Sequence, residues 1–105
     1  MDFLKEITAI FRQHEISQYS ELNFQIFNKS EKHPSSEGIT FESPNFAGEI
    51  FYYANKVMEY CEMEILIFKR EKYRFKIIEK PNLKELKKKI AEFLTEIINE
   101  LKSSR

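Results

Sequence analysis

The chain has 105 residues, 42% hydrophobic and 32% charged, and its 17 basic residues balance its 17 acidic ones. This length and composition predict one globular domain, 1–105, and exclude a disordered chain. A net charge of zero excludes a general electrostatic attraction to nucleic acid, and a single cysteine excludes a disulfide framework within the chain.

The first predicted element is an amphipathic helix. Apolar residues recur at helical spacing from Phe3 to Phe11, Asp2 is a suitable N-cap, and the pattern ends near His14. The segment 28–37 is polar and predicts a loop, and Asn55-Lys56 predicts a two-residue hairpin turn. Alternating apolar runs predict five strands around these turns, at 22–27, 39–42, 46–54, 57–68 and 73–78.

The last predicted element is a long helix. Pro81 and Asn82 end the fifth strand, and an apolar stripe then runs from Leu83 to Leu101. The predicted order is therefore α-β-β-β-β-β-α. Consecutive strands between two helices predict an α+β fold, in which an antiparallel five-stranded meander has the N- and C-terminal helices packed on one face.

The two faces of the predicted central hairpin differ in character. A two-residue turn places Ile50 opposite Cys61 and Gly48 opposite Met63, which predicts a core face and a buried thiol. The other face gathers acidic and aromatic residues. Opposed like charges cost stability, and aromatic residues are enriched at protein interfaces. We therefore predict a partner-binding site formed by Glu49, Phe51, Tyr53, Tyr60, Glu62 and Glu64.

The length of the turn at 69–72 decides which side of the fifth strand faces the helices. An odd-length turn directs Arg74 and Lys76 toward the glutamates and buries Tyr73, Phe75 and Ile77. We prefer this register because it buries the apolar set. In it the basic side chains would neutralise the acidic ones, so neutralisation and partner binding are alternative explanations of the glutamates.

No pattern typical of catalysis or of cofactor binding is found in the sequence. His14 and His33 have no Cys or second His at metal-ligand spacing, and Cys61 lacks an adjacent base. The prediction is a protein that is not an enzyme and has neither cofactor nor metal. The charged start and the absence of an apolar run of about 20 residues predict a cytoplasmic protein without signal peptide or membrane span.

The segment 39–50, Ile-Thr-Phe-Glu-Ser-Pro-Asn-Phe-Ala-Gly-Glu-Ile, resembles the TriTu family of polymorphic-toxin immunity proteins. The segment 62–65 is similar to the acidic fourth-strand region of that family, and the flanking helices fit, so the resemblance spans nearly the whole chain. It implies a bacterial immunity protein, of contact-dependent growth inhibition or a related route. Such a protein binds the C-terminal domain of one cognate toxin, often a nuclease, as a 1:1 heterodimer. It inhibits without catalysis, and contacts neither nucleic acid nor membrane.

Other functions stay open at this point. A small secretion chaperone would bind an extended effector segment and would usually be a dimer. An RNA-binding platform would stack bases on the aromatic residues, although glutamates repel phosphate. A small enzyme without recognisable motifs is the remaining alternative.

Overall fold

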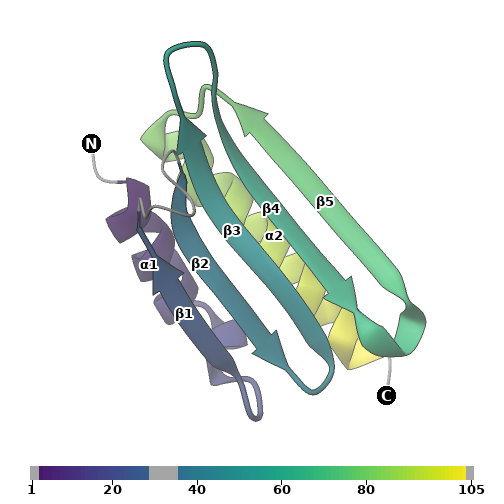
Figure 1. Ribbon diagram of the computed structural model, residues 1–105. Helices are drawn as coiled ribbons and strands as arrows, with labels where there is room; N and C mark the ends of the chain where they lie inside the picture. The colour runs from purple at the N-terminus through teal and green to yellow at the C-terminus, as the bar shows by residue number, and fades with distance from the viewer. Residues whose placement is uncertain (1–2, 29–35, 104–105) are drawn as a thin grey trace.

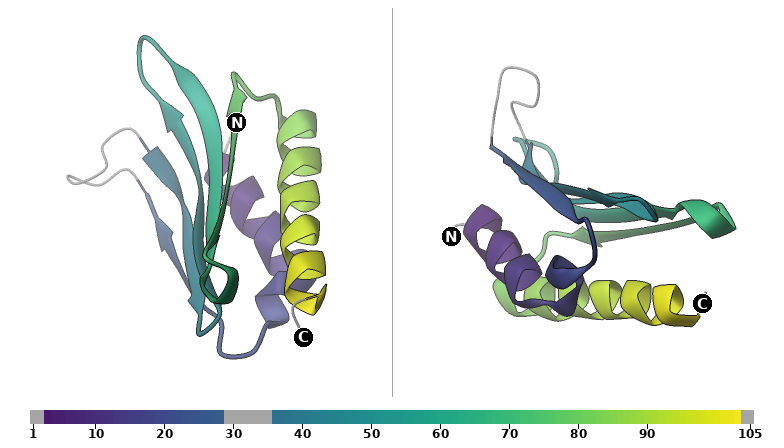
Figure 2. Two further views of the ribbon diagram at one scale, coloured as in Figure 1. Left: turned by 90° about the vertical axis from the view of Figure 1, so that its right-hand side faces the viewer. Right: turned by 90° about the horizontal axis from the view of Figure 1, so that it is seen from below.

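The computed structural model describes residues 3–28 and 36–103, and its strands form one antiparallel sheet in the order β1-β2-β3-β4-β5 (Figure 1). Both α-helices lie on the same face of this sheet (Figure 2). The predicted α+β meander is therefore confirmed. The elements in chain order are α1 (Phe3–Gln13), η1 (Glu15–Gln18), β1 (Asn23–Phe27), β2 (Ser36–Ser43), β3 (Phe46–Ala54), β4 (Glu59–Ile67), η2 (Phe68–Arg70), β5 (Lys72–Glu79) and α2 (Leu83–Ser103).

Some predicted boundaries differ from the observed ones. The loop predicted at 28–37 extends two residues too far, because β2 begins at Ser36 and Glu37 pairs with Tyr52 of β3. Asp2 and His33 lie outside the described residues. No helix in the described part of the chain is long and apolar enough to cross a membrane.

The core fills the space between the sheet and the two helices. The ring of Phe11 on α1 lies 5.1 Å from that of Phe41 on β2 and 5.3 Å from that of Phe24 on β1. Cys61 is fully buried, as predicted, and its burial raises the pKa of the thiol to about 12. The thiol is therefore a neutral packing group at physiological pH. Other fully buried core side chains are those of Ile7, Ile39, Ile50, Met63, Ile90 and Leu94.

Side-chain hydrogen bonds cap the N-termini of two helical segments, η1 and α2. The Oδ1 atom of Asn82 accepts a hydrogen bond from the Glu85 N–H at 2.8 Å, which confirms the predicted start of α2. His14 Nδ1 accepts from the Ile16 N–H at 3.1 Å, so a neutral His14 ring carries its proton on Nε2 and donates it to Thr95 Oγ1, 3.1 Å away. Burial lowers the pKa of His14, in keeping with the neutral ring. His14 thus joins η1 to α2.

The predicted two-residue turn between β3 and β4 is wrong. Residues 55–58 form the connection, in which Asn55 Oδ1 accepts from the N–H groups of Val57 and Met58 at 2.8 Å. Two extra turn residues shift the pairing by two, so Ile50 lies opposite Met63 instead of Cys61. A shift of two keeps each side chain on its predicted face. The acidic and core faces of the hairpin are therefore as predicted, with different partners across the strands.

The predicted orientation of β5 is also wrong. The connection is 68–71, an even number of residues closed by Glu71 in the left-handed conformation (φ 49°). Lys72 consequently pairs with Ile67, and Arg74 with Ile65, on the helix side of the sheet. Tyr73, Phe75 and Ile77 therefore project from the opposite face, where the prediction had placed Arg74 and Lys76.

An acidic side chain of α2 explains why basic residues of β5 face the helices. Glu100 has a side chain only 6% exposed, and its two carboxylate oxygens lie 2.6 Å from Lys72 Nζ and 2.8 Å from Arg74 Nε. Arg74 Nη1 also lies 3.2 Å from Glu96. The preference for burying the largest apolar set fails here because a nearly buried carboxylate needs cationic partners.

Replacing Glu100 by Gln is expected to lower the free energy of unfolding at pH 7 by about 1–2 kcal/mol, because charge-assisted hydrogen bonds to Lys72 and Arg74 are lost. Hydrogen bonding from Lys72 and the charge of Arg74 lower the pKa of Glu100 below the ordinary 4.5, so the stabilisation exists above that pH and disappears as the pH falls through the lower folded value. Urea denaturation measures the difference. Glu92→Gln, on an exposed part of α2, is the control, and equal losses in both variants would contradict the role of Glu100.

Candidate functional site

The candidate site is the face of the sheet opposite the helices, which we call the open face; no described helix or strand covers it (Figure 2). Strand pairing assigns alternate residues of all five strands to this face. Among these described positions there is neither Lys nor Arg. The acidic residues on the face are Glu42, Glu49, Glu62, Glu64 and Glu79.

The structure brings the six predicted site residues together on the open face. Glu49 pairs with Glu64 and Tyr53 pairs with Tyr60 across the β3–β4 hairpin. The rings of Tyr53 and Tyr60 stack with centroids 5.1 Å apart. The remaining pair is Phe51 with Glu62.

Three of these residues form an acidic cluster, which we define as Glu49, Glu62 and Glu64. One carboxylate oxygen from each lies within 4.8 Å of the others. Burial, followed by hydrogen bonding to Glu64 and by the neighbouring negative charges, raises the pKa of Glu49 to about 8. The hydrogen bond from Glu49 in turn lowers the pKa of Glu64. At neutral pH the cluster therefore holds a proton, which Glu49 carries and shares with Glu64.

Tyr73 of β5 completes the hydrogen bonding of this cluster. Its hydroxyl donates to Glu64 Oε2 at 2.6 Å, and this bond raises the pKa of Tyr73 to about 12. The cluster is thus an arrangement of carboxylates that lacks a basic side chain to neutralise it within the described part of the face. Neutralisation by Arg74 and Lys76, the alternative that the sequence left open, is excluded because both project toward the helices.

The β5 side chains were missed by the sequence prediction. We define the β5 strip as Tyr73, Phe75 and Ile77, and it continues onto β4 through Leu66. These four side chains are exposed by 57%, 50%, 44% and 41%, respectively, on one face. The sequence signal for their orientation is the pair Glu96 and Glu100, one helical turn apart on α2. These carboxylates pair with Arg74 of β5, so the basic residues of β5 face the helix and the apolar ones face away from it.

A glycine allows β2 and β3 to approach closely beside the aromatic part of the face. Gly38 of β2 lies opposite Phe51, and a Cβ atom at Gly38 would come within 2.7 Å of the Phe51 Cβ and 2.1 Å of the Ile50 carbonyl oxygen. Real Cβ atoms do not approach so closely. The close approach of the β3 backbone therefore leaves no room for a side chain at position 38.

The described residues offer little for catalysis or cofactor binding. The acidic cluster is the one group of three or more described His, Cys, Asp and Glu residues close enough to share an ion. Cys61 is buried among apolar side chains, and both ring nitrogens of His14 have partners within the fold. The site presents carboxylates and exposed apolar side chains, which are suited to contact positively charged and apolar groups.

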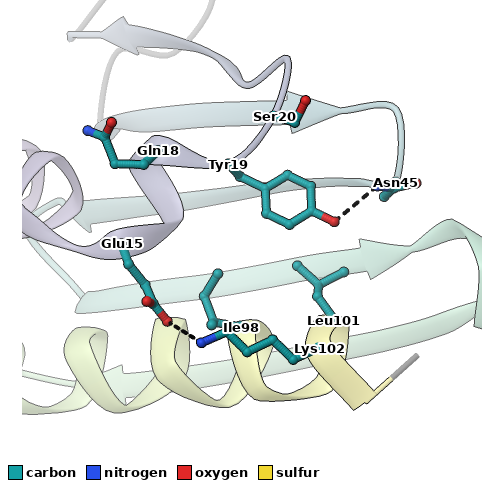
Figure 3. Close-up of a pocket in the computed structure, with 8 residues that line it drawn as sticks. All are labelled: Glu15, Gln18, Tyr19, Ser20, Asn45, Ile98, Leu101 and Lys102. Carbon is teal, nitrogen blue, oxygen red and sulfur yellow. Dashed lines mark hydrogen bonds and ion pairs between the residues drawn. The ribbon is translucent and has the colours of Figure 1, made fainter. Parts of the chain in front are cut away.

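A hollow lies on the helix side, where η1 meets the β2–β3 turn and the end of α2 (Figure 3). It has a volume of about 370 Å³. Four of its polar side chains form two pairs: Asn45 Nδ2 donates to the Tyr19 hydroxyl at 3.0 Å, and Lys102 Nζ lies 3.4 Å from Glu15. These partnerships stabilise the junction of the three segments.

The pH dependence of stability tests the geometry of the acidic cluster. Because the folded pKa of Glu49 is raised from 4.5 to about 8, the folded chain binds more protons than the unfolded chain between these values, and the free energy of unfolding falls as the pH rises through them. Glu49→Gln is expected to remove part of this fall and to be more stable than the parent chain at pH 8. Urea denaturation midpoints across this range are the measurement. Glu42→Gln, exposed on β2, is the control; identical profiles for Glu49→Gln and the parent would contradict the shared proton.

Comparison with protein-family models, with curated proteins and with solved structures finds no match for this chain. The resemblance to the TriTu immunity proteins therefore stays a prediction from the sequence. The open face has to be interpreted from its own geometry and charge.

Proposed function

We propose that this protein is an immunity protein that binds a cognate toxin domain and neutralises it by stoichiometric inhibition, without catalysis. The observation that supports this most is the composition of the open face. Five glutamates and four well-exposed apolar side chains lie on one uncovered sheet surface whose described positions include no Lys or Arg.

A solvated surface does not by itself account for this composition. Glu49 lies directly opposite Glu64, and burial together with the neighbouring carboxylates raises the pKa of Glu49 to about 8, so full ionisation of the cluster is costly. Exposed aromatic and aliphatic side chains beside them leave apolar surface in contact with water, which is unfavourable. Both features are costs in the free chain that a bound partner offsets, because the partner supplies positive charge and covers apolar surface.

The chemistry of this face suits a toxin that acts on nucleic acid. A nuclease domain holds phosphate groups with Lys and Arg, so its active-site surface is basic. An acidic and aromatic face complements such a surface electrostatically, speeds its association and supplies anchors for tight binding. Occupation of the basic surface then blocks access of the substrate. The TriTu-like segment and the predicted cytoplasmic location agree with a protector made in the toxin-producing cell.

The proposal is tested with the C-terminal toxin domain of the protein encoded immediately upstream. Co-expression of this chain is expected to abolish the toxicity of that domain, and calorimetry is expected to give a 1:1 complex with a Kd below about 10 nM, or about −11 kcal/mol. A toxin domain that remains toxic and does not bind would contradict the proposal. A dimer of this chain that binds only an unfolded, extended segment would support the secretion-chaperone alternative instead.

Charge reversal locates the contact. Glu62→Lys is expected to weaken the complex at least tenfold, mainly through slower association at low salt, because it opposes the attraction between the two surfaces. Surface plasmon resonance at two ionic strengths measures both rates. Glu92→Lys on α2 makes the same charge change on the helix side and is expected to leave the rates unchanged.

A further inference from the structure

The corrected register of β5 places exposed apolar side chains directly beside the acidic cluster. Phe75 pairs with Glu64, and Ile77 pairs with Glu62, so each of these carboxylates has an exposed apolar neighbour on β5. Paired side chains on one face of an antiparallel sheet are about 5 Å apart. The boundary between β4 and β5 is therefore a row in which carboxylates of β4 lie beside apolar side chains of β5.

A hollow lies at one end of this row. It has a volume of about 290 Å³, opens widely to the surface, and is lined on the open face by Glu49, Glu64, Leu66 and Tyr73. One side of it offers carboxylate oxygens and the other offers an aromatic ring and an aliphatic side chain. Lys and Arg have the matching construction, since an apolar stem carries a charged head. Arg also stacks on aromatic rings.

We propose that the open face binds a basic protein surface centred on β4 and β5, which lays a Lys or Arg side chain between the acidic cluster and the β5 strip and packs apolar neighbours on Leu66, Phe75 and Ile77. This inference rests on the proposed function and names the chemistry of the partner. It moves the centre of the contact from the β3–β4 hairpin, where the sequence placed it, toward the edge of the sheet.

Charge complementarity favours this occupant over others. A nucleic acid would bring phosphates onto a face that carries five glutamates, and no described Lys or Arg of that face would receive them. A second copy of this chain, joined open face to open face, would bring two acidic clusters together. A basic protein surface is the occupant that supplies the positive charge needed for Glu49, Glu62 and Glu64 to ionise together.

Binding of a cation at this place is linked to pH. The titratable groups that face Glu49 are Glu64 and Glu62 of β4, with Tyr73 of β5 bonded to Glu64. Its direct neighbour on β2 is Thr40, which does not titrate. The proton that Glu49 carries opposes an incoming cation. A bound Lys or Arg therefore releases this proton. The affinity is expected to rise as the pH increases toward about 8 and to level off above it.

Peptide probes test this surface without the toxin. The probes are the acetylated and amidated peptides Gly-Arg-Leu-Arg-Gly and Gly-Glu-Leu-Glu-Gly, titrated to millimolar concentration into the isotope-labelled full chain and followed by NMR. The arginine peptide is expected to shift resonances of β4 and β5, and its affinity is expected to rise about threefold or more from about pH 6 to about pH 8. The glutamate peptide and an RNA oligonucleotide are expected to shift none of them.

Two substitutions separate the acidic from the apolar contribution to peptide binding. Glu64→Gln and Phe75→Ser are each expected to weaken arginine-peptide binding about threefold or more, and Glu92→Gln on α2 is the matched control. Glu64→Gln is nearly isosteric, so it separates lost recognition from lost folding if Phe75→Ser unfolds. Shifts confined to the helix side, equal shifts with both peptides, shifts with RNA, or no shifts at all would overturn the inference. A toxin that still binds in any of those cases would leave the proposed function standing, whereas a chain that binds the arginine peptide and no toxin would contradict the proposed function alone.

Discussion

The ion pairs of Glu100 determine what the rest of the sheet presents to its surroundings. This carboxylate lies at the sheet–helix boundary, almost without access to water, and Lys72 and Arg74 reach it from β5. A strand with alternating basic and apolar residues must turn one set toward the helices. Because the basic set faces Glu100, the apolar set faces outward, and the glutamates of the open face lose the cations that would otherwise neutralise them.

The neutral net charge of the chain conceals a strong separation of charge in space. The basic residues of β5 lie on the helix side, whereas the open face carries only acidic charges at its described positions. Such a face produces a local negative potential although the molecule as a whole is neutral, and local potential is what steers an approaching partner. Because the pKa of Glu49 is raised to about 8, ionisation of the acidic cluster lowers the stability of the free protein as the pH rises, and the proposed partner would offset this cost.

The edge position of β5 bears on how the proposed partner would bind. Lys72, Arg74 and Lys76 point inward from this edge strand, and inward-pointing charges are a common protection of sheet edges against pairing with another chain. The exposed apolar side chains belong to the face and not to the edge. At the β5 edge, this arrangement favours a proposed partner that covers the face with folded surface over one that adds a strand, which is how a secretion chaperone would often hold an extended segment.

The sequence by itself determined the elements, their order and the division of the β3–β4 hairpin into two faces, because side-chain periodicity is a local property of the chain. It therefore placed Glu49, Tyr60 and their neighbours together on one face even though the turn was two residues longer than predicted. Only the tertiary structure decided the register across the strands and the orientation of β5. Those depend on turn lengths and on a contact between β5 and Glu100, 26 residues beyond Arg74, where a buried charge outweighs the burial of Phe75.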